Sequence, residues 1–312
     1  MNRFTEWLPD RVDTRIRVFA WISFAVQTII IGTGGAVRLT GSGLGCPTWP
    51  TCTPDSLVPT EELSYHSLIE FGNRMMTGVV GIIALVLFVL VWRIRAERRD
   101  LFTLAFIVGA GIVAQAIVGG ITVWTGLNPF IVGFHYVSSL LLVCVCAAFL
   151  VRMDAPPGPR ERAVPGWYAG LTHATTAVLA LTIVFGVLTT GSGPHSGDAD
   201  AGRNGFDSEL FQHVHAWPGY ALLALTVVLL VAAWRLRLPT IRALVLLLVV
   251  ELVQVAVGLY QARAGLPPFA VGVHMVLAAL TAAAMTVVVL RLKRPAATPA
   301  ASEAAPAAAS AR

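Results

Sequence analysis

Charged side chains are scarce in this sequence of 312 residues: Asp, Glu, Lys and Arg make up 12% of it, whereas 56% of the residues are hydrophobic. A soluble domain carries about 25% charged residues, so this composition excludes an ordinary cytosolic enzyme and most nucleic-acid-binding proteins. Lysine is nearly absent, because Lys293 is the one lysine among 22 basic residues. The four cysteines include no CxxC pair of the kind that binds zinc. We therefore expect no nucleic-acid partner and no zinc site.

The hydrophobic residues form long runs instead of short alternating ones. About 20 consecutive apolar residues are needed to cross a bilayer core, and the sequence contains eight runs of roughly that length. We predict membrane spans at 17–37, 69–92, 101–125, 131–151, 168–190, 212–235, 240–262 and 270–291. The fold class is therefore expected to be an all-α membrane protein surrounded by lipid.

The basic residues are distributed unequally between the two sides of these spans. Of the 22 basic residues, 18 fall on the side that carries both termini, which leaves Arg38, Arg74, Arg203 and Arg263 on the other. Lys and Arg accumulate in loops that stay in the cytoplasm. We therefore expect a multi-pass protein of a bacterial cytoplasmic membrane with both termini in the cytoplasm.

The two halves of the chain resemble each other. The motif Thr-Gly-Ser-Gly at 40–43 recurs at 190–193, and the pattern that runs from Gln115 and Gly119 to His135 recurs from Gln254 to His274. Each half has an even number of spans, so the repeats have the same orientation in the membrane. We predict two tandem parallel four-helix bundles. The expected segments are a cytoplasmic N-terminal segment (1–16), the first repeat (17–151), a cytoplasmic linker (152–167), the second repeat (168–291) and a disordered cytoplasmic tail (292–312).

The duplication aligns polar residues near the start of four spans. It pairs His135 with His274 and Asn73 with His215. Paired histidines on facing helices of a bundle hold heme iron, so we predict that His215 and His274 ligate a heme. The alternatives are that each histidine only hydrogen-bonds a neighbouring helix, or that His213 replaces His215 as the ligand.

The first half has Asn73 where the second ligand would be. Asparagine is a poor ligand for iron, so His135 would hold a heme alone and leave one iron position open for chemistry on a substrate. Glu70 lies three residues before Asn73, on the same helix face. This carboxylate has two possible roles: an acid, base or charge-stabilising group beside the open site, or a local ion pair with Arg74.

Cys46 and Cys52 lie in a loop on the side opposite the termini. That side is expected to be oxidising, so a disulfide is the default state of the pair. Its role is either structural or the exchange of electrons with a partner thiol.

The stretch Gly-Gly-Ala-Val-Arg-Leu-Thr-Gly-Ser-Gly-Leu-Gly-Cys-Pro at 34–47, followed by Trp49, Pro50 and Cys52, resembles the first outer loop of heme A synthases. The segment from Glu70 to Arg74, the helices of His135 and His274, and the duplicated eight-span layout fit the same family. The resemblance extends over residues 15–295.

The resemblance implies an enzyme that oxidises the C8 methyl group of heme O to a formyl group, making heme A for terminal oxidases. It implies a substrate heme in the first half at His135, Asn73 and Arg74, with Glu70 as the catalytic carboxylate. Heme b would be the cofactor of the second half, and Cys46 with Cys52 would be the outer-loop cysteine pair. Heme O synthase and terminal oxidase assembly proteins are the expected partners, whereas nothing in the sequence indicates the electron acceptor.

This sequence departs from the family at one position of the substrate site. The family commonly has His where Asn73 stands, so either His135 holds heme O alone or another residue such as His66 substitutes. Two other functions are alternatives: a two-heme b-type cytochrome that exchanges electrons with quinone, and a transporter with parallel repeats. A transporter would place polar residues at the membrane midplane, whereas here they gather toward one end of the spans.

Overall fold

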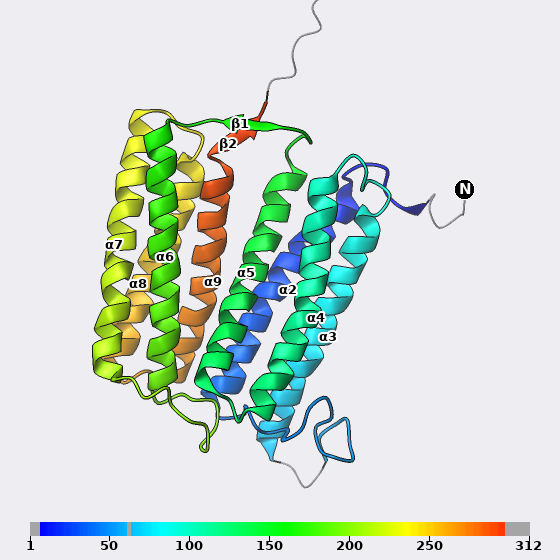
Figure 1. Ribbon diagram of the computed structural model, residues 1–312, viewed down its shortest axis with the longest axis vertical. Coiled ribbons are helices and arrows are strands. Elements are labelled where there is room, and N and C mark those ends of the chain that lie inside the picture. Colours follow the sequence, from blue (N-terminus) through cyan, green and yellow to red (C-terminus); the bar gives the residue numbers. More distant parts are fainter. Residues whose placement is uncertain (1–6, 61–63, 297–312) are drawn as a thin grey trace, which may run out of the picture.

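The computed structural model describes residues 7–60 and 64–296 (Figure 1). Residues 1–6 of the predicted N-terminal segment and residues 297–312 of the predicted disordered tail lie outside the described residues. Within the described ranges, eight helices are long and apolar enough to cross a membrane. They are α2 (Thr14–Leu39), α3 (Tyr65–Val91), α4 (Arg99–Trp124), α5 (Pro129–Met153), α6 (Gly166–Ser192), α7 (Ser208–Arg235), α8 (Ile241–Arg263) and α9 (Pro268–Leu290).

These helices confirm the predicted all-α, multi-pass membrane fold, although α3 and α7 begin four residues before the predicted spans. The difference arises because the first turn of each helix contains polar residues, His66 and Ser67 in α3 and Ser208 and Glu209 in α7. Asp207 accepts a hydrogen bond from the backbone N–H of Leu210 at 2.7 Å and so caps α7. Asp13 and Asn128 cap α2 and α5 in the same way. Hydrophobicity identifies the membrane core of a helix and misses a capped polar turn.

Helices α2–α5 form one four-helix unit and α6–α9 form the other, side by side in tandem (Figure 1). The two units pack mainly through α2 and α5 against α9. Alanines at 147, 279 and 283 lie in the hydrophobic cluster at this seam, and small residues allow close approach of membrane helices. The hydroxyl of Tyr136 on α5 also donates a hydrogen bond to the carbonyl of Met275 on α9 at 2.8 Å.

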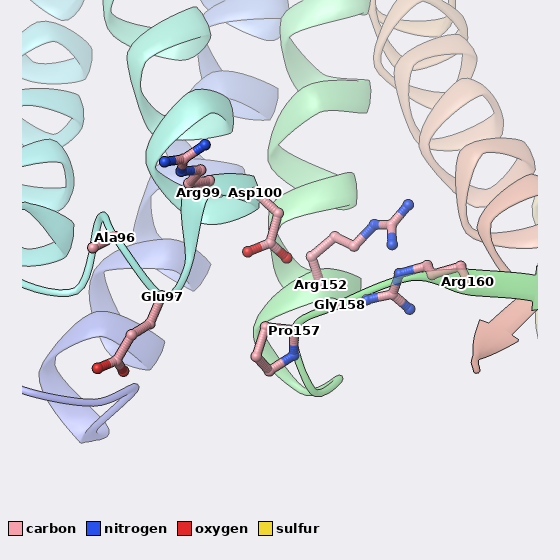
Figure 2. A pocket seen from close by; sticks show the side chains of 8 residues that line it. All are labelled: Ala96, Glu97, Arg99, Asp100, Arg152, Pro157, Gly158 and Arg160. Atoms are coloured by element: carbon pink, nitrogen blue, oxygen red, sulfur yellow. The ribbon is translucent and has the colours of Figure 1, made fainter. Parts of the chain in front are cut away.

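One end of the structure, here called the termini end, carries a short antiparallel ribbon of β1 (Arg160–Arg162) and β2 (Lys293–Pro295). The start of the tail predicted to be disordered is therefore paired with the predicted linker. A second feature of this end is a small pocket beside the beginning of α4 and the end of α5 (Figure 2). It is lined by Ala96, Glu97, Arg99, Asp100, Arg152, Pro157, Gly158 and Arg160.

The opposite end, here called the disulfide end, carries the loop between α2 and α3 with both Cys46 and Cys52, and the loop at 193–207 between α6 and α7 (Figure 1). Helices α3, α5, α7 and α9 all begin at this end. The predicted site residues on these helices lie within the first three turns, so they belong to the disulfide end and are separate from the pocket of Figure 2.

Candidate functional site

The second unit brings His215 on α7 close to His274 on α9. The centroids of the two imidazole rings are 6.0 Å apart and the ring planes are nearly perpendicular, at 82°. An imidazole nitrogen binds a metal at about 2 Å, so two rings on opposite sides of one metal have centroids roughly 6 Å apart. The separation of these two rings therefore fits axial ligation of a single iron.

The nitrogen atoms of this pair are also suited to ligation. Nδ1 of His215 lies 2.9 Å from the carbonyl of Thr182, and a hydrogen bond at one ring nitrogen orients the other toward a metal. Nδ1 of His274 is buried and has no hydrogen-bond partner. Among the described residues, no group of three or more His, Cys, Asp or Glu side chains could hold a bare metal ion. A heme needs only axial ligands from the protein, so this pair fits a heme.

A glycine on the neighbouring helix faces each ring of the second unit. A Cβ atom at Gly186 on α6 would lie 2.8 Å from Cε1 of His215, and one at Gly258 on α8 would lie 3.1 Å from Cε1 of His274. Any larger side chain at Gly186 would displace the ring. Sequence reasoning missed this role of the glycines, although Gly258 was visible as a repeated position.

The first unit has the same arrangement with more space. Gly119 on α4 faces His135, and a Cβ atom added at Gly119 would lie 3.5 Å from Cε1 of the ring. Gly34 on α2 faces Asn73, and a Cβ atom added at Gly34 would lie 3.9 Å from Oδ1 of the amide. Nδ1 of His135 is buried without a hydrogen-bond partner. Oδ1 of Asn73 accepts a hydrogen bond from Thr33 at 2.8 Å. His135 and Asn73 thus face glycines as His274 and His215 do.

The two histidines considered as alternative ligands have other surroundings. Nδ1 of His66 is 2.8 Å from Oγ of Ser42, and its ring lies 4.0 Å from the ring of Tyr65. His66 therefore takes part in loop packing at the disulfide end. His213 is exposed, whereas His215 is paired with His274.

Glu70 and Arg74, one turn apart on α3, hold the cysteine loop. The Glu70 carboxylate accepts the backbone N–H of Cys46 at 2.7 Å through Oε2 and pairs with Nη2 of Arg74 at 2.6 Å through Oε1. The Arg74 guanidinium also donates to the carbonyls of Cys46, Thr48 and Thr51 at 3.2, 2.9 and 3.0 Å. The ion pair considered from the sequence is present, and it anchors the loop as well.

The loop itself is closed by a disulfide between Cys46 and Cys52, and both residues are fully buried. Trp49, between them, packs edge-to-face on Trp124 at 5.4 Å and fills the space beside Gly120 of α4. The disulfide loop therefore contacts both α3 and α4, at the end of the unit that contains Asn73 and His135.

Comparison with known proteins identifies sequences that are similar to this chain. The sequence model of a family described as cytochrome oxidase assembly protein matches residues 17–195. The chain is 40% identical over 141 residues to a heme A synthase of Lysinibacillus sphaericus (strain C3-41), which covers 44% of this chain and 45% of that protein. It is 31% identical over 164 residues to a heme A synthase of Bacillus cereus (strain AH187), which covers 50% of this chain and 48% of that protein.

A heme A synthase of Listeria welshimeri is 30% identical over 139 residues, or 44% of this chain and 45% of the relative. The chain thus aligns over about half the length of the curated relatives that it matches. The family match includes the disulfide loop, Glu70, Asn73 and His135, whereas His215 and His274 lie beyond residue 195.

Proposed function

This chain belongs to the cytochrome oxidase assembly protein family, and from that membership we propose that it is a heme A synthase. The proposed reaction oxidises the C8 methyl group of heme O to a formyl group and supplies heme A for terminal oxidase assembly. The main structural support is that equivalent positions of one duplicated scaffold present two imidazoles in one unit and a single imidazole in the other. Such a protein would hold one heme firmly and offer a second heme an open iron position.

We assign the substrate to the first unit, 17–151. His135 would bind the iron of heme O from one side, and Asn73 and Arg74 would border the site. Asn73 offers no strong iron ligand, so the substrate would have one protein ligand and could leave after oxidation. The disulfide loop, held by Arg74 and packed on Trp124, would cover this end of the site and limit the entry of water.

We assign heme b to the second unit, 168–291, with His215 and His274 as its ligands. When bound, heme b would supply one-electron transfer, by which electrons removed from the methyl group could leave the substrate site. Thr182 would fix the orientation of the His215 ring through its carbonyl, and Gly186 and Gly258 would leave room for both imidazoles.

Glu70 is the proposed catalytic carboxylate, which would accept a proton or stabilise positive charge as the methyl carbon is oxidised. Its hydrogen bonds to Cys46 and Arg74 keep the carboxylate at the inner side of the disulfide loop. The same bonds give it an anchoring role, so the two roles have to be separated by experiment.

We also propose that the termini end faces the cytoplasm, since basic residues gather there. The disulfide end would then face an oxidising compartment, which suits a Cys46–Cys52 bond. Heme O synthase and terminal oxidase assembly proteins are the proposed partners.

The function is tested by expressing the protein in a host that makes heme O but no heme A, and by identifying the extracted hemes by chromatography and mass spectrometry. Heme A, or its hydroxylated precursor, together with heme b is the expected result. Heme b with unchanged heme O, in the presence of a working electron partner, would indicate an electron-transferring cytochrome instead. A protein without heme would exclude both functions.

The role of Glu70 is tested by comparing Glu70→Gln with Arg74→Gln in the same host. Glu70→Gln keeps an acceptor for the Cys46 amide but removes the charge, whereas Arg74→Gln removes most bonds to the loop. For a catalytic carboxylate, Glu70→Gln lowers the rate of heme A formation by roughly a hundredfold or more, and Arg74→Gln lowers it less. Wild-type rates in Glu70→Gln would remove this carboxylate from the mechanism.

A further inference from the structure

Arg38 connects the two units at the disulfide end. It lies at the end of α2 in the first unit and is half-buried, and its guanidinium reaches the second unit. Nε donates to the carbonyl of His195 at 2.7 Å and Nη2 to the carbonyl of Thr190 at 3.0 Å. These two bonds leave the Nη1 amino group of Arg38 for another acceptor.

A second arginine lies near Arg38. Arg203, in the loop at 193–207, bonds to the carbonyl of Pro194, the residue just before His195, whose carbonyl binds Arg38. Its guanidinium donates to the carbonyls of Ala201 and Pro194 at 3.1 and 2.8 Å. Both arginines thus bond to backbone carbonyls, which carry no formal charge.

No acidic side chain balances this pair. Within residues 7–60 and 64–296, neither guanidinium has a carboxylate oxygen within 4.0 Å, whereas Arg74 at the same end has Glu70. Arg38 is half-buried at the seam and Arg203 is exposed beside it, so an anion bound between the two guanidinium groups would offset their like charges.

The arginine pair lies on the disulfide side of the candidate heme ligands. Leu39, next to Arg38, is 3.2 Å from the Cβ position of Gly272, which precedes His274 by two residues. The ring of His195 also contacts the carbonyl of Leu266, just before α9, at 2.9 Å. The carboxylates of a heme bound near His274 would have a cationic neighbour in this direction, and bidentate or paired contacts with arginine are the strong form of carboxylate binding.

We propose that Arg38 and Arg203 form a carboxylate-binding site for the propionate groups of a tetrapyrrole. This inference rests on the proposed function, because it requires a bound heme. The propionates could belong to the heme held by His215 and His274 or to the substrate heme at His135, and the test separates these two sources.

The experiment compares the binding of iron protoporphyrin IX with that of its dimethyl ester, in which both propionates are uncharged. Purified full-length protein is titrated with each compound, as wild type and as Arg203→Gln, Arg38→Lys and Arg38→Gln. Arg263→Gln is the matched control, since it removes an exposed positive charge from the same end of the structure. We expect wild type and Arg263→Gln to bind the diacid roughly tenfold more tightly than the diester. Arg203→Gln and Arg38→Gln should lose most of that preference, and Arg38→Lys should retain part of it.

Repeating the titrations in two histidine variants identifies which heme supplies the carboxylates. A preference that persists in His135→Ala protein and disappears in His274→Ala protein assigns the site to the heme of the second unit, and the reverse pattern assigns it to the substrate heme. Arg203 is exposed, so Arg203→Gln tests the site even where Arg38→Gln fails to fold.

Two results would overturn the inference: equal binding of diacid and diester by wild type, or an unchanged preference in Arg203→Gln and Arg38→Lys together. If the wild-type protein converts heme O but binds the diacid and the diester equally, this carboxylate site is rejected and the proposed function stands. Failure of wild type to bind either compound would reject both.

Discussion

The position on α7 that faces α6 is His215 in the second unit, whereas the equivalent position on α3 that faces α2 is Asn73 in the first. The partner position is histidine in both units, at His274 and His135. The facing glycines differ as well. A Cβ atom added at Gly186 would lie 2.8 Å from the His215 ring, whereas one added at Gly34 would lie 3.9 Å from the Asn73 side chain. One unit therefore fits closely around two imidazoles, and the other has a single imidazole and spare room.

The loops at the disulfide end also differ between the two units. The first unit has a disulfide loop held by Glu70 and Arg74. The loop of the second unit, 193–207, has no cysteine, and its Gly197 carbonyl accepts the backbone N–H of Gly43 in the first loop at 2.7 Å. The two units thus share their helices and differ at this end. The proposed function accounts for this difference, because it has the second unit retain a cofactor and the first unit exchange a substrate.

The largest effect is expected from removing a ligand of the second unit. His215→Ala or His274→Ala should reduce the heme b retained after purification by more than about tenfold, because even the loss of an outer-shell contact costs a metal site about 10–100-fold. The amount is measured from the absorbance of extracted heme per mole of protein. His213→Ala is the control and should retain heme, and depletion in His213→Ala with retention in His215→Ala would exchange the two assignments.

A second variant makes the first unit more like the second. Asn73→His should place an imidazole against Gly34. Space is available there, because even a Cβ atom added at Gly34 would lie 3.9 Å from the side chain of Asn73. With a second axial ligand, heme O should bind roughly tenfold more tightly and show a second low-spin signal by electron paramagnetic resonance. Asn73→Ala is the control for loss of the hydrogen bond from Thr33. An unchanged spectrum in Asn73→His with heme O bound would show that the two positions are not equivalent.

Much of this architecture follows from the sequence. Apolar length gave the eight helices, and the repeat paired His215 with Asn73 and His274 with His135. The helix starts at Tyr65 and Ser208 were placed too late, because polar residues in a first turn weaken its apolar signature; of the two starts, the one at Ser208 is capped by a side chain. The equivalent positions of a repeat can be found from the sequence, because they are matching residues at a constant spacing.

Contacts between distant segments could not be predicted in this way. The sequence left Glu70 as either a catalytic group or an ion pair, and its bond to the Cys46 amide joins residues 24 positions apart through the path of a loop. The reach of Arg38 to Thr190 and His195 likewise depends on how the units pack. Strand β2 arises from pairing between a linker and a tail, and neither segment has a strand pattern of its own.

A matched pair of glycine variants tests the difference in fit with a smaller expected effect. Gly186→Ala brings a Cβ atom to 2.8 Å from His215, and such overpacking costs about 1–3 kcal/mol, so heme b retention should fall several-fold. Gly34→Ala meets only ordinary contacts, so it should be neutral or stabilise the helix by about 0.5–1 kcal/mol. Thermal unfolding and heme content are measured for both. Equal behaviour of the two variants would contradict a tighter second unit.

The smallest effect on heme b is expected from the double variant Cys46→Ser, Cys52→Ser. Removing a cross-link over so short a loop costs roughly 2 kcal/mol of local stability, but Arg74 still binds the carbonyls of Cys46, Thr48 and Thr51 through hydrogen bonds. Hydrogen exchange should therefore increase in the disulfide loop and remain unchanged around His215 and His274. Heme b content should stay at the wild-type value, while heme O conversion should fall, because the loop would cover only the proposed substrate site of the first unit. Loss of heme b from this variant would mean that the first loop also supports the second unit, through its contact between Gly43 and Gly197.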